Sequence, residues 1–292
     1  MNKNYLVIIV LFIATAISFI LFQPDGKLHF IACDVGQGDA ILIVKGYDQV
    51  LIDGGPNDKV LGCLSRNIPF WDKKIEMVVN THPDADHLKG LISVLTNYQV
   101  DQVLANSVVD DTGLFRQFHD LVMTKKIKVY SPEAGEKIKI GTLEFAVLWP
   151  ADKIGDLAMW QSPLAQKSAV LGATTTKESL NEYSVVLILK YKNFSALLTG
   201  DLSSDQESQI ISRCQTINCP KNIDILKVGH HGSSASTSEE FLDYFRPKQA
   251  VISVGSGNQW GHPRQDVLDR LSKVSSKILR TDLSGDIKIY SD

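Results

Sequence analysis

Residues 82–87 place four ionisable side chains, His82, Asp84, Asp86 and His87, directly after the apolar run 77–79. Imidazole and carboxylate together suit zinc, manganese or iron, whereas a thiolate site would need cysteines. A helix N-terminus could use one of the aspartates as a cap, but that role explains neither histidine. The segment therefore indicates a metal site.

A calcium loop is the main alternative for the same segment. An EF-hand counted from Asp84 needs Gly and Glu at the positions where this chain has Lys89 and Leu95. The sequence excludes that type of site here.

Three further polar clusters also follow predicted strands. Asp53 lies in "LIDGG", Asp201 in "LLTGD", and His230 and His231 in "LKVGHHGSS". Taken alone, Asp201 could cap the following helix and the histidine pair could be a polar loop. Taken together, such clusters favour a metal centre, because a sheet holds its strand ends rigidly while the next residue can enter a cleft.

The remaining histidines have weaker claims to chemistry. His29 lies in a predicted strand and His119 on an amphipathic helix, so both are expected to be structural. His262, in "WGHPR", stays a candidate for the site.

Short β-rich runs alternate with helix-like segments from residue 28 onward. The predicted strands cover 28–33, 40–44, 49–53, 76–80, 100–105, 143–149, 183–191, 194–200, 223–229, 249–255 and 286–290. Helices are predicted after residue 56, from about residue 87, and over 113–123, 203–213, 238–245 and 264–273. This α/β mixture predicts two sheets with helices on their outer faces, in one domain covering 28–292. Residues 151–182 lack the pattern, and such long irregular segments are often lids.

The N-terminal segment has no charged residue between positions 5 and 22. A stretch of this length can cross a bilayer as a helix, and the flanking charges favour a domain that faces outward. We therefore expect a membrane anchor at 1–27, with a single span at about 5–22, a short linker at 23–27 and an extracellular catalytic domain. A cleaved signal peptide is the alternative, because residues 14–16 resemble a cleavage site.

The four cysteines leave the redox setting open. Cys214 and Cys219 are close enough in sequence to form a disulfide in an oxidising compartment, or they are unrelated thiols. Cys33 and Cys63 are expected to be buried packing residues rather than ligands.

The composition is that of an ordinary globular protein, with 292 residues, 44% hydrophobic residues and a net charge of -3. Domains that grip nucleic acid over a broad face are usually basic. Any contact with nucleic acid must therefore be local.

The strand-end clusters resemble those of the metallo-β-lactamase fold hydrolases, whose usual motif is H-x-H-x-D-H. More narrowly, the chain resembles the extracellular domain of the ComEC competence proteins, over residues 28–290. The counterparts occur in the same order and are "DVGQGDAILI", "LIDGG", "THPDADHLKGL", "NEYSVVL", "LLTGD", "KVGHHGS", "VGSGNQWGHP" and "RTDLSGDI". The resemblance implies an αβ/βα sandwich with two divalent metal ions, Zn²⁺ or Mn²⁺, at its open edge.

The resemblance also implies roles for individual residues. The implied ligands are His82, Asp84, Asp86, His87, Asp201 and one of His230 and His231. Asp201 would bridge the ions, and Asp53 would orient a ligand. Asp84 replaces the second histidine of the usual motif, and no strand-end histidine lies between Leu88 and Asp201. Both departures make the site richer in oxygen, which favours manganese, keeps zinc possible and leaves the occupancy of both positions open.

The leading hypothesis is a membrane-anchored phosphodiesterase, and more specifically a DNA nuclease. Besides Asp86, the free member of the pair His230 and His231, or His262, would serve the leaving oxygen, and Ser233 and Ser234 would hold phosphate oxygens. The ComEC channel is not part of this sequence, so DNA transport would need a separate channel protein as partner. Lys73, Lys74 and Lys89 beside the motif, and Arg264 after His262, favour a polyanionic substrate.

Two alternatives remain open on the sequence. One is a metallophosphoesterase for a small or cell-surface substrate, such as a phosphocholine-type ester, which the acidic net charge and a lid at 151–182 would suit. The other is a non-catalytic binding module whose metal is structural. A β-lactamase proper is disfavoured by the altered motif.

Overall fold

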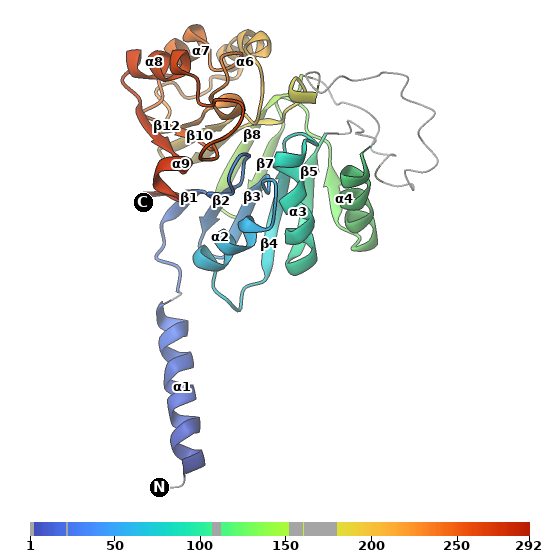
Figure 1. Ribbon diagram of the computed structural model, residues 1–292, viewed down its shortest axis with the longest axis vertical. Coiled ribbons are helices and arrows are strands. Elements are labelled where there is room, and N and C mark those ends of the chain that lie inside the picture. Colours follow the sequence, from blue (N-terminus) through green and yellow to red (C-terminus); the bar gives the residue numbers. More distant parts are fainter. Residues whose placement is uncertain (1–2, 22, 107–111, 152–159, 161–179) are drawn as a thin grey trace.

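The computed structural model describes residues 3–21, 23–106, 112–151, 160 and 180–292. Within these residues, two seven-stranded sheets lie against each other and helices cover the outer face of each (Figure 1). The αβ/βα sandwich expected from the sequence is thus confirmed.

The first sheet has the strand order β14-β1-β2-β3-β4-β5-β6. Its strands are β1 (Leu28–Ala32), β2 (Ile41–Lys45), β3 (Asp48–Ile52), β4 (Lys74–Asn80), β5 (Gln99–Ala105), β6 (Lys128–Tyr130) and β14 (Ile287–Ser291). Its outer face is covered by α2 (Lys59–Asn67), α3 (Ala85–Asn97) and α4 (Gly113–Thr124). Strands β3, β4, β5 and β6 run parallel, which brings their carboxyl ends to one edge.

The second sheet repeats this plan with the order β13-β12-β11-β10-β9-β8-β7. Its strands are β7 (Lys137–Ile140), β8 (Leu143–Trp149), β9 (Val186–Tyr191), β10 (Phe194–Leu198), β11 (Ile225–Lys227), β12 (Gln249–Ile252) and β13 (Lys277–Arg280). The helices α6 (Ser204–Ile217), α7 (Glu239–Phe245) and α8 (Gln265–Lys273) cover it, and α9 (Thr281–Ser284) precedes β14. The hairpin predicted around residues 192–193 is present as β9 and β10.

Three layers of apolar side chains hold these elements together. One fills the space between the sheets, and the other two lie between each sheet and its helices. Strand β10 is buried along its whole length, as expected of a strand covered on both faces. The two buried sheets therefore form a rigid frame for the residues that follow their strands.

The N-terminal helix α1 (Lys3–Leu21) extends away from the sandwich (Figure 1). Among the described residues, no helix combines the length and the apolar character needed to cross a membrane. The predicted span at 5–22, and with it the single-pass topology, is not supported.

Both cysteine pairs form disulfides. Cys214 bonds to Cys219, which settles the open alternative, and Cys33 bonds to Cys63. The expectation that Cys33 and Cys63 are buried is confirmed, but their pairing was missed because 30 residues separate them. The bond joins the loop after β1 to helix α2, on the side of the first sheet that carries the site.

Candidate metal centre

The predicted site residues meet at the carboxyl ends of parallel strands from both sheets. Asp53 follows β3, and the segment 81–87, called the β4 segment below, follows β4. Asp201 comes after β10, and the turn Gly229–Gly232, called the β11 segment, comes after β11. The Val185 backbone N–H donates to the Thr81 carbonyl over 2.9 Å and joins the two sheets beside these ends.

Four side chains form the centre of the cluster, and we call them the metal group: Asp86, His87, Asp201 and His231. One potential ligand atom of each lies within 4.8 Å of the others. Asp201 Oδ2 is 3.3 Å from both His87 Nε2 and His231 Nε2, and His231 Nε2 is 3.4 Å from Asp86 Oδ2. Asp201 is thus the shared neighbour of both histidines, a central place that suits the bridging role that the resemblance implies.

Buried polar atoms without partners mark this place as a cation site. His87 Nε2, His231 Nε2, Asp201 Oδ1 and, next to the group, His82 Nε2 are buried and have no hydrogen-bond partner among the described residues. Leaving such atoms unpaired is costly, and they are the atoms that bind divalent metals. The residues present therefore fit the metal that the resemblance implies.

The β4 segment is fixed by a chain of side-chain hydrogen bonds. The Thr81 hydroxyl donates to Asp53 Oδ2 over 2.7 Å and can accept from His82 Nδ1, 3.0 Å away. His87 Nδ1 lies 2.8 Å from the same Asp53 oxygen and donates to it. Because Nδ1 is the donor on both rings, Nε2 is the nitrogen through which either ring would bind a metal. Asp53 thus contacts a ligand in the way expected of an orienting residue.

The β11 segment is held by an unusual backbone instead. His230 and His231 have φ of 45° and 54°, in the left-handed region that side chains rarely adopt. This turn sends the two imidazoles to different places. His231 is buried and donates through Nδ1 to the Ser253 carbonyl over 2.9 Å, which leaves its Nε2 for the metal group. Of the pair, His231 therefore joins the metal group.

His230 lies at the edge of the cluster. Its side chain is 33% exposed, and its Nε2 is 3.7 Å from Asp201 Oδ2. Its ring centroid is 5.7 Å from that of His262, and the Ser233 backbone N–H donates to its carbonyl over 2.9 Å. His230, His262 and Ser233 thus form one border of the site, where a substrate could contact them.

Asp84 and His82 are the other two candidate ligands of the β4 segment. Asp84 is the N-cap residue of α3, and its Oδ2 lies 3.9 Å from His82 Nε2. Neither belongs to the metal group, although the His82 ring centroid is 4.1 Å from that of His87. His82 thus lies beside a member of the metal group, but neither His82 nor Asp84 belongs to a group of three or more potential ligands among the described residues.

The electrostatics separate the histidines into two kinds. Burial would lower the pKa values of His87 and His231, but the Asp201 carboxylate outweighs it and raises both well above the usual value. Burial likewise opposes ionisation of Asp201, yet the two histidines hold its pKa well below the usual range. In contrast, burial and the nearby His87 lower the pKa of His82 to about 3. His82 is therefore a neutral imidazole, ready to bind a cation at any physiological pH.

His262 is also neutral near pH 7. Partial burial and the neighbouring His230 lower its pKa to about 4. A group with this pKa is a poor proton donor at neutral pH, which weakens the predicted role of His262 as a general acid. The neutral ring can still donate one N–H hydrogen bond to a substrate oxygen.

Two charged residues of the site were not singled out from the sequence. Asp39, in the loop before β2, is 2% exposed, and Lys227, the last residue of β11, is 1% exposed. Burial opposes ionisation of Asp39, but Lys227 outweighs it and lowers the Asp39 pKa to about 2. The available signal was a charged residue at an apolar run, with Asp39 directly before "AILIV" and Lys227 inside "ILKV".

The basic residues expected around the motif divide into two sets. Lys74 opens β4, about 20 Å of strand away from the site at the other end, and pairs with Asp101 and Glu76. Lys73 precedes it and lies over the Tyr98 ring. The expectation that these two lysines lie beside the site is therefore wrong. Lys89 and Arg264 are both exposed. Lys89 lies two residues after His87, and Arg264 lies two residues after His262.

Most of the predicted lid at 151–182 lies outside the described residues. Trp160 is described and stacks on His119, with ring centroids 5.5 Å apart. His119 is buried in this aromatic contact and lies outside both groups of potential metal ligands in the described chain. Its expected structural role agrees with this placement.

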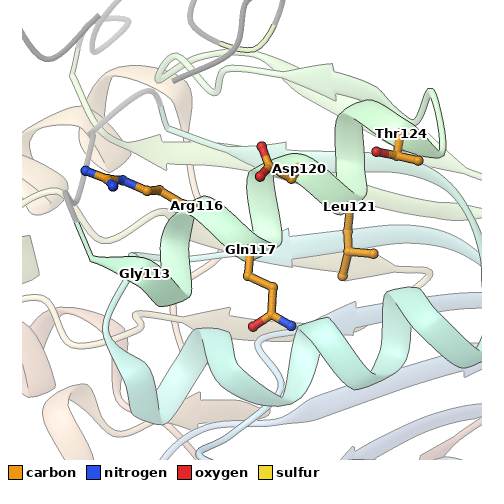
Figure 2. Close-up of a pocket in the computed structure, with 6 residues that line it drawn as sticks. All are labelled: Gly113, Arg116, Gln117, Asp120, Leu121 and Thr124. Carbon is orange, nitrogen blue, oxygen red and sulfur yellow. The ribbon is translucent and has the colours of Figure 1, made fainter. Parts of the chain in front are cut away.

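A separate surface depression lies along α4, and its lining contains none of the potential metal ligands described above. Its lining includes Arg116 and Asp120, on successive turns of the helix, together with Gln117 and Thr124 (Figure 2). The groups of potential metal ligands found in the described chain are at the strand ends and include none of these residues. We therefore place the chemistry at the strand ends.

Comparison with known proteins agrees with the geometry. The sequence model of the metallo-beta-lactamase superfamily matches residues 33–256. The chain is 29% identical to ComE operon protein 3 of Bacillus subtilis, over 94% of this chain and 35% of that protein. It is 30% identical to recombination protein 2 of Haemophilus influenzae, over 88% of this chain and 28% of that protein. It thus spans about a third of the length of these relatives.

A solved structure shows the same fold. The metallo-beta-lactamase fold protein YhfI of Bacillus subtilis superimposes with a TM-score of 0.57 at 11% identity, over 91% of this chain and 100% of that one. This structure shows the fold alone, whereas the sequence relatives confirm the expected resemblance to ComEC-like competence proteins.

Proposed function

The chain belongs to the metallo-beta-lactamase superfamily, and from that premise we propose that it is a metal-dependent phosphodiesterase that cleaves DNA. The observation that carries the proposal is the metal group, whose buried ligand atoms are unpaired and share Asp201. When bound, divalent ions there supply positive charge to a phosphate and make a water acidic enough to attack it at neutral pH.

The protein's own residues divide the remaining work. Asp53 and Thr81 hold the rings of His87 and His82 in one tautomer. Asp201 and Asp86 concentrate negative charge, which attracts cations to the buried centre. His230 and His262 border the open side, where neutral imidazoles can donate hydrogen bonds to phosphate or leaving-group oxygens. Ser233 and exposed Arg264 would contact the same phosphate.

We propose manganese as the preferred ion, with zinc as the alternative. Three of the candidate ligands are carboxylates, namely Asp84, Asp86 and Asp201. Oxygen-rich sites favour harder ions, whereas sites of three histidines favour zinc. The position at His82 and Asp84 has fewer ligands than the metal group, so the two ions should bind stepwise, the second more weakly.

DNA is preferred over a small phosphoester because of the relatives and the border residues. The sequence relatives are competence and recombination proteins, and the exposed Lys89 and Arg264 follow His87 and His262 closely in sequence. Both disulfides further favour an oxidising compartment, as expected of a protein that meets DNA outside the cytoplasm.

The test is a substrate panel on metal-loaded protein. Single-stranded DNA, double-stranded DNA, RNA and bis-p-nitrophenyl phosphate are each incubated with the wild-type chain and with Asp201→Asn. We expect DNA cleavage that Asp201→Asn abolishes. The matched control is Asp205→Asn, an exposed aspartate four residues on, which should cleave like the wild type. Cleavage of the small diester alone would favour the phosphoesterase, and ion binding with no hydrolysis would favour the binding module.

A further inference from the structure

A buried ion pair lies directly behind the metal ligands. Lys227 Nζ is 2.5 Å from Asp39 Oδ2, and both side chains are almost fully buried. We propose that this pair is a clamp that positions His231, His87 and Asp201 for metal binding, so that Lys227 is a positioning residue of the site. The inference rests on the proposed function only in taking the metal group as the ion-binding centre.

Asp39 contacts the back of both ligand rings. Its Oδ1 lies 3.4 Å from His231 Nδ1, and its Oδ2 lies 4.0 Å from His87 Nδ1. These nitrogens are on the side of each ring opposite Nε2. A negative charge there favours the tautomer with the proton on Nδ1, which frees Nε2 and makes it a stronger ligand.

Lys227 connects this carboxylate to the third ligand. Its Nζ donates to the Gly200 carbonyl over 3.4 Å, and Gly200 directly precedes Asp201. The Thr199 hydroxyl in turn donates to the Lys227 carbonyl over 2.8 Å. One ammonium therefore links the loop of Asp39, in the first sheet, to the turn of Asp201, in the second.

Stability of the fold does not explain such a pair. Lys227 is in a buried strand whose other two residues, Ile225 and Leu226, are apolar. Replacing a buried ion pair with apolar side chains is often neutral or stabilising, because both charges must be desolvated. A lysine at this position is better explained by the charge that it places beneath the ligands.

The pair also limits where cations can bind. Asp39, Asp53 and His87 form a second group of potential ligands within 4.8 Å of one another, on the Nδ1 side of His87. The Lys227 ammonium already neutralises one carboxylate of that group. The clamp therefore directs divalent ions to the Nε2 side, where the metal group lies.

The experiment separates positioning from simple folding. We compare Lys227→Met, Asp39→Asn and the double variant, measuring the Tm of the metal-free chain and the Kd for Mn²⁺ by calorimetry. Each single variant should lower the Tm, because it leaves a buried charge unpaired. The double variant should recover most of the Tm but bind Mn²⁺ ~10–100-fold more weakly, as is typical when a group behind a ligand is lost.

The control is the pair Lys248–Asp224, which has a similar distance of 2.7 Å but lies far more exposed. Lys248→Met should leave the Kd unchanged. Wild-type Mn²⁺ affinity in the double variant would show that the pair serves the fold alone and would overturn the proposal. If the double variant does not fold, Asp39→Asn decides, because unchanged affinity there overturns the proposal equally.

The readout is ion binding and needs no substrate. If the wild-type chain binds Mn²⁺ but cleaves no phosphodiester, the proposed function is wrong, while the proposed role of the ion pair is unaffected. If the wild-type chain cleaves DNA but the variants bind Mn²⁺ as tightly as the wild type, the proposed function stands and the clamp is wrong.

Discussion

The β4 segment and the β11 segment bring histidines to the same centre by different means. In the β4 segment, regular structure does most of the work, because a strand ends at Asn80 and helix α3 begins at Ala85. Its rings are then fixed by the hydrogen bonds of Thr81 and Asp53. In the β11 segment, the backbone itself does the work, with consecutive residues at positive φ from His230 to Gly232.

The difference shows which features each segment depends on. The β4 segment depends on the Asp53 carboxylate, which follows β3. Removing that charge should weaken metal binding and leave the fold intact. The β11 segment depends on a strained turn, so a change of backbone there should affect the fold as well. The turn packs tightly against Pro263, since a Cβ at Gly232 would lie 2.6 Å from Pro263 Cβ.

The largest expected effect separates the two histidines of the β11 segment. His231→Ala removes a buried member of the metal group, whereas His230→Ala removes a one-third exposed ring at its border. We expect His231→Ala to weaken Mn²⁺ binding at least ~100-fold, more than loss of a partner behind a ligand usually does. His230→Ala should bind Mn²⁺ like the wild type but cleave ~100-fold more slowly.

Calorimetry and single-turnover cleavage at saturating Mn²⁺ distinguish these outcomes. If His230→Ala loses the ion and His231→Ala keeps it, the assignment of the pair is reversed.

The next effect tests the β4 segment through Asp53. Asp53→Asn keeps the shape and tolerates the positive φ of 58° found here, but removes the charge behind His87. We expect Mn²⁺ affinity to fall ~10–100-fold with little change in the urea midpoint of the metal-free chain. Asp48→Asn, at the other end of β3, is the control. A large loss of stability with normal affinity would show that Asp53 supports the fold rather than the ligand.

The third effect tests the backbone of the β11 segment. Gly232→Ala places a Cβ against Pro263 at a φ of 84°, so we expect a loss of about 2 kcal/mol in unfolding free energy. Gly257→Ala is the matched control, because it has a φ of 66° with nothing within 4 Å of the added Cβ. It should cost about 1 kcal/mol. Equal losses in urea unfolding would mean that the packing against Pro263 contributes nothing.

Sequence reasoning reached the β4 segment more fully than the β11 segment, and the reason is physical. Ligands that follow a strand and open a helix are visible as an apolar run, a polar cluster and a helical period. Which of His230 and His231 enters the metal group depends on two φ angles, and no side-chain pattern reports these. The assignment therefore stayed open until the turn was seen.

The contacts across the sandwich were beyond the sequence for a similar reason. Lys227 and Asp39 are 188 residues apart and come from different halves of the sandwich, and each alone is only a charge at an apolar run. Cys33 and Cys63 were likewise read as separate side chains. Lys73 and Lys74 were placed beside the site because they are close in sequence, although β4 carries them to its far end. Most strands were found, since their periods and turns are local, but β6, β7 and β13 were missed, and these strands have only three or four residues each.

The smallest expected effect compares the outer flanks of the two segments. Lys89 follows the β4 segment and Arg264 lies beyond His262, which borders the β11 segment, and both are exposed. If DNA crosses the site, each of Lys89→Gln and Arg264→Gln should lower kcat/KM on DNA ~3-fold at low salt and reduce the salt slope by ~1. Neither should alter cleavage of bis-p-nitrophenyl phosphate, which is too small to reach both flanks. Lys73→Gln, at the far end of β4, is the control that should change nothing. Rates between 50 and 200 mM salt give the slopes, and a slope unchanged in both variants would remove the polyanion from the proposal and leave a small phosphoester as the substrate.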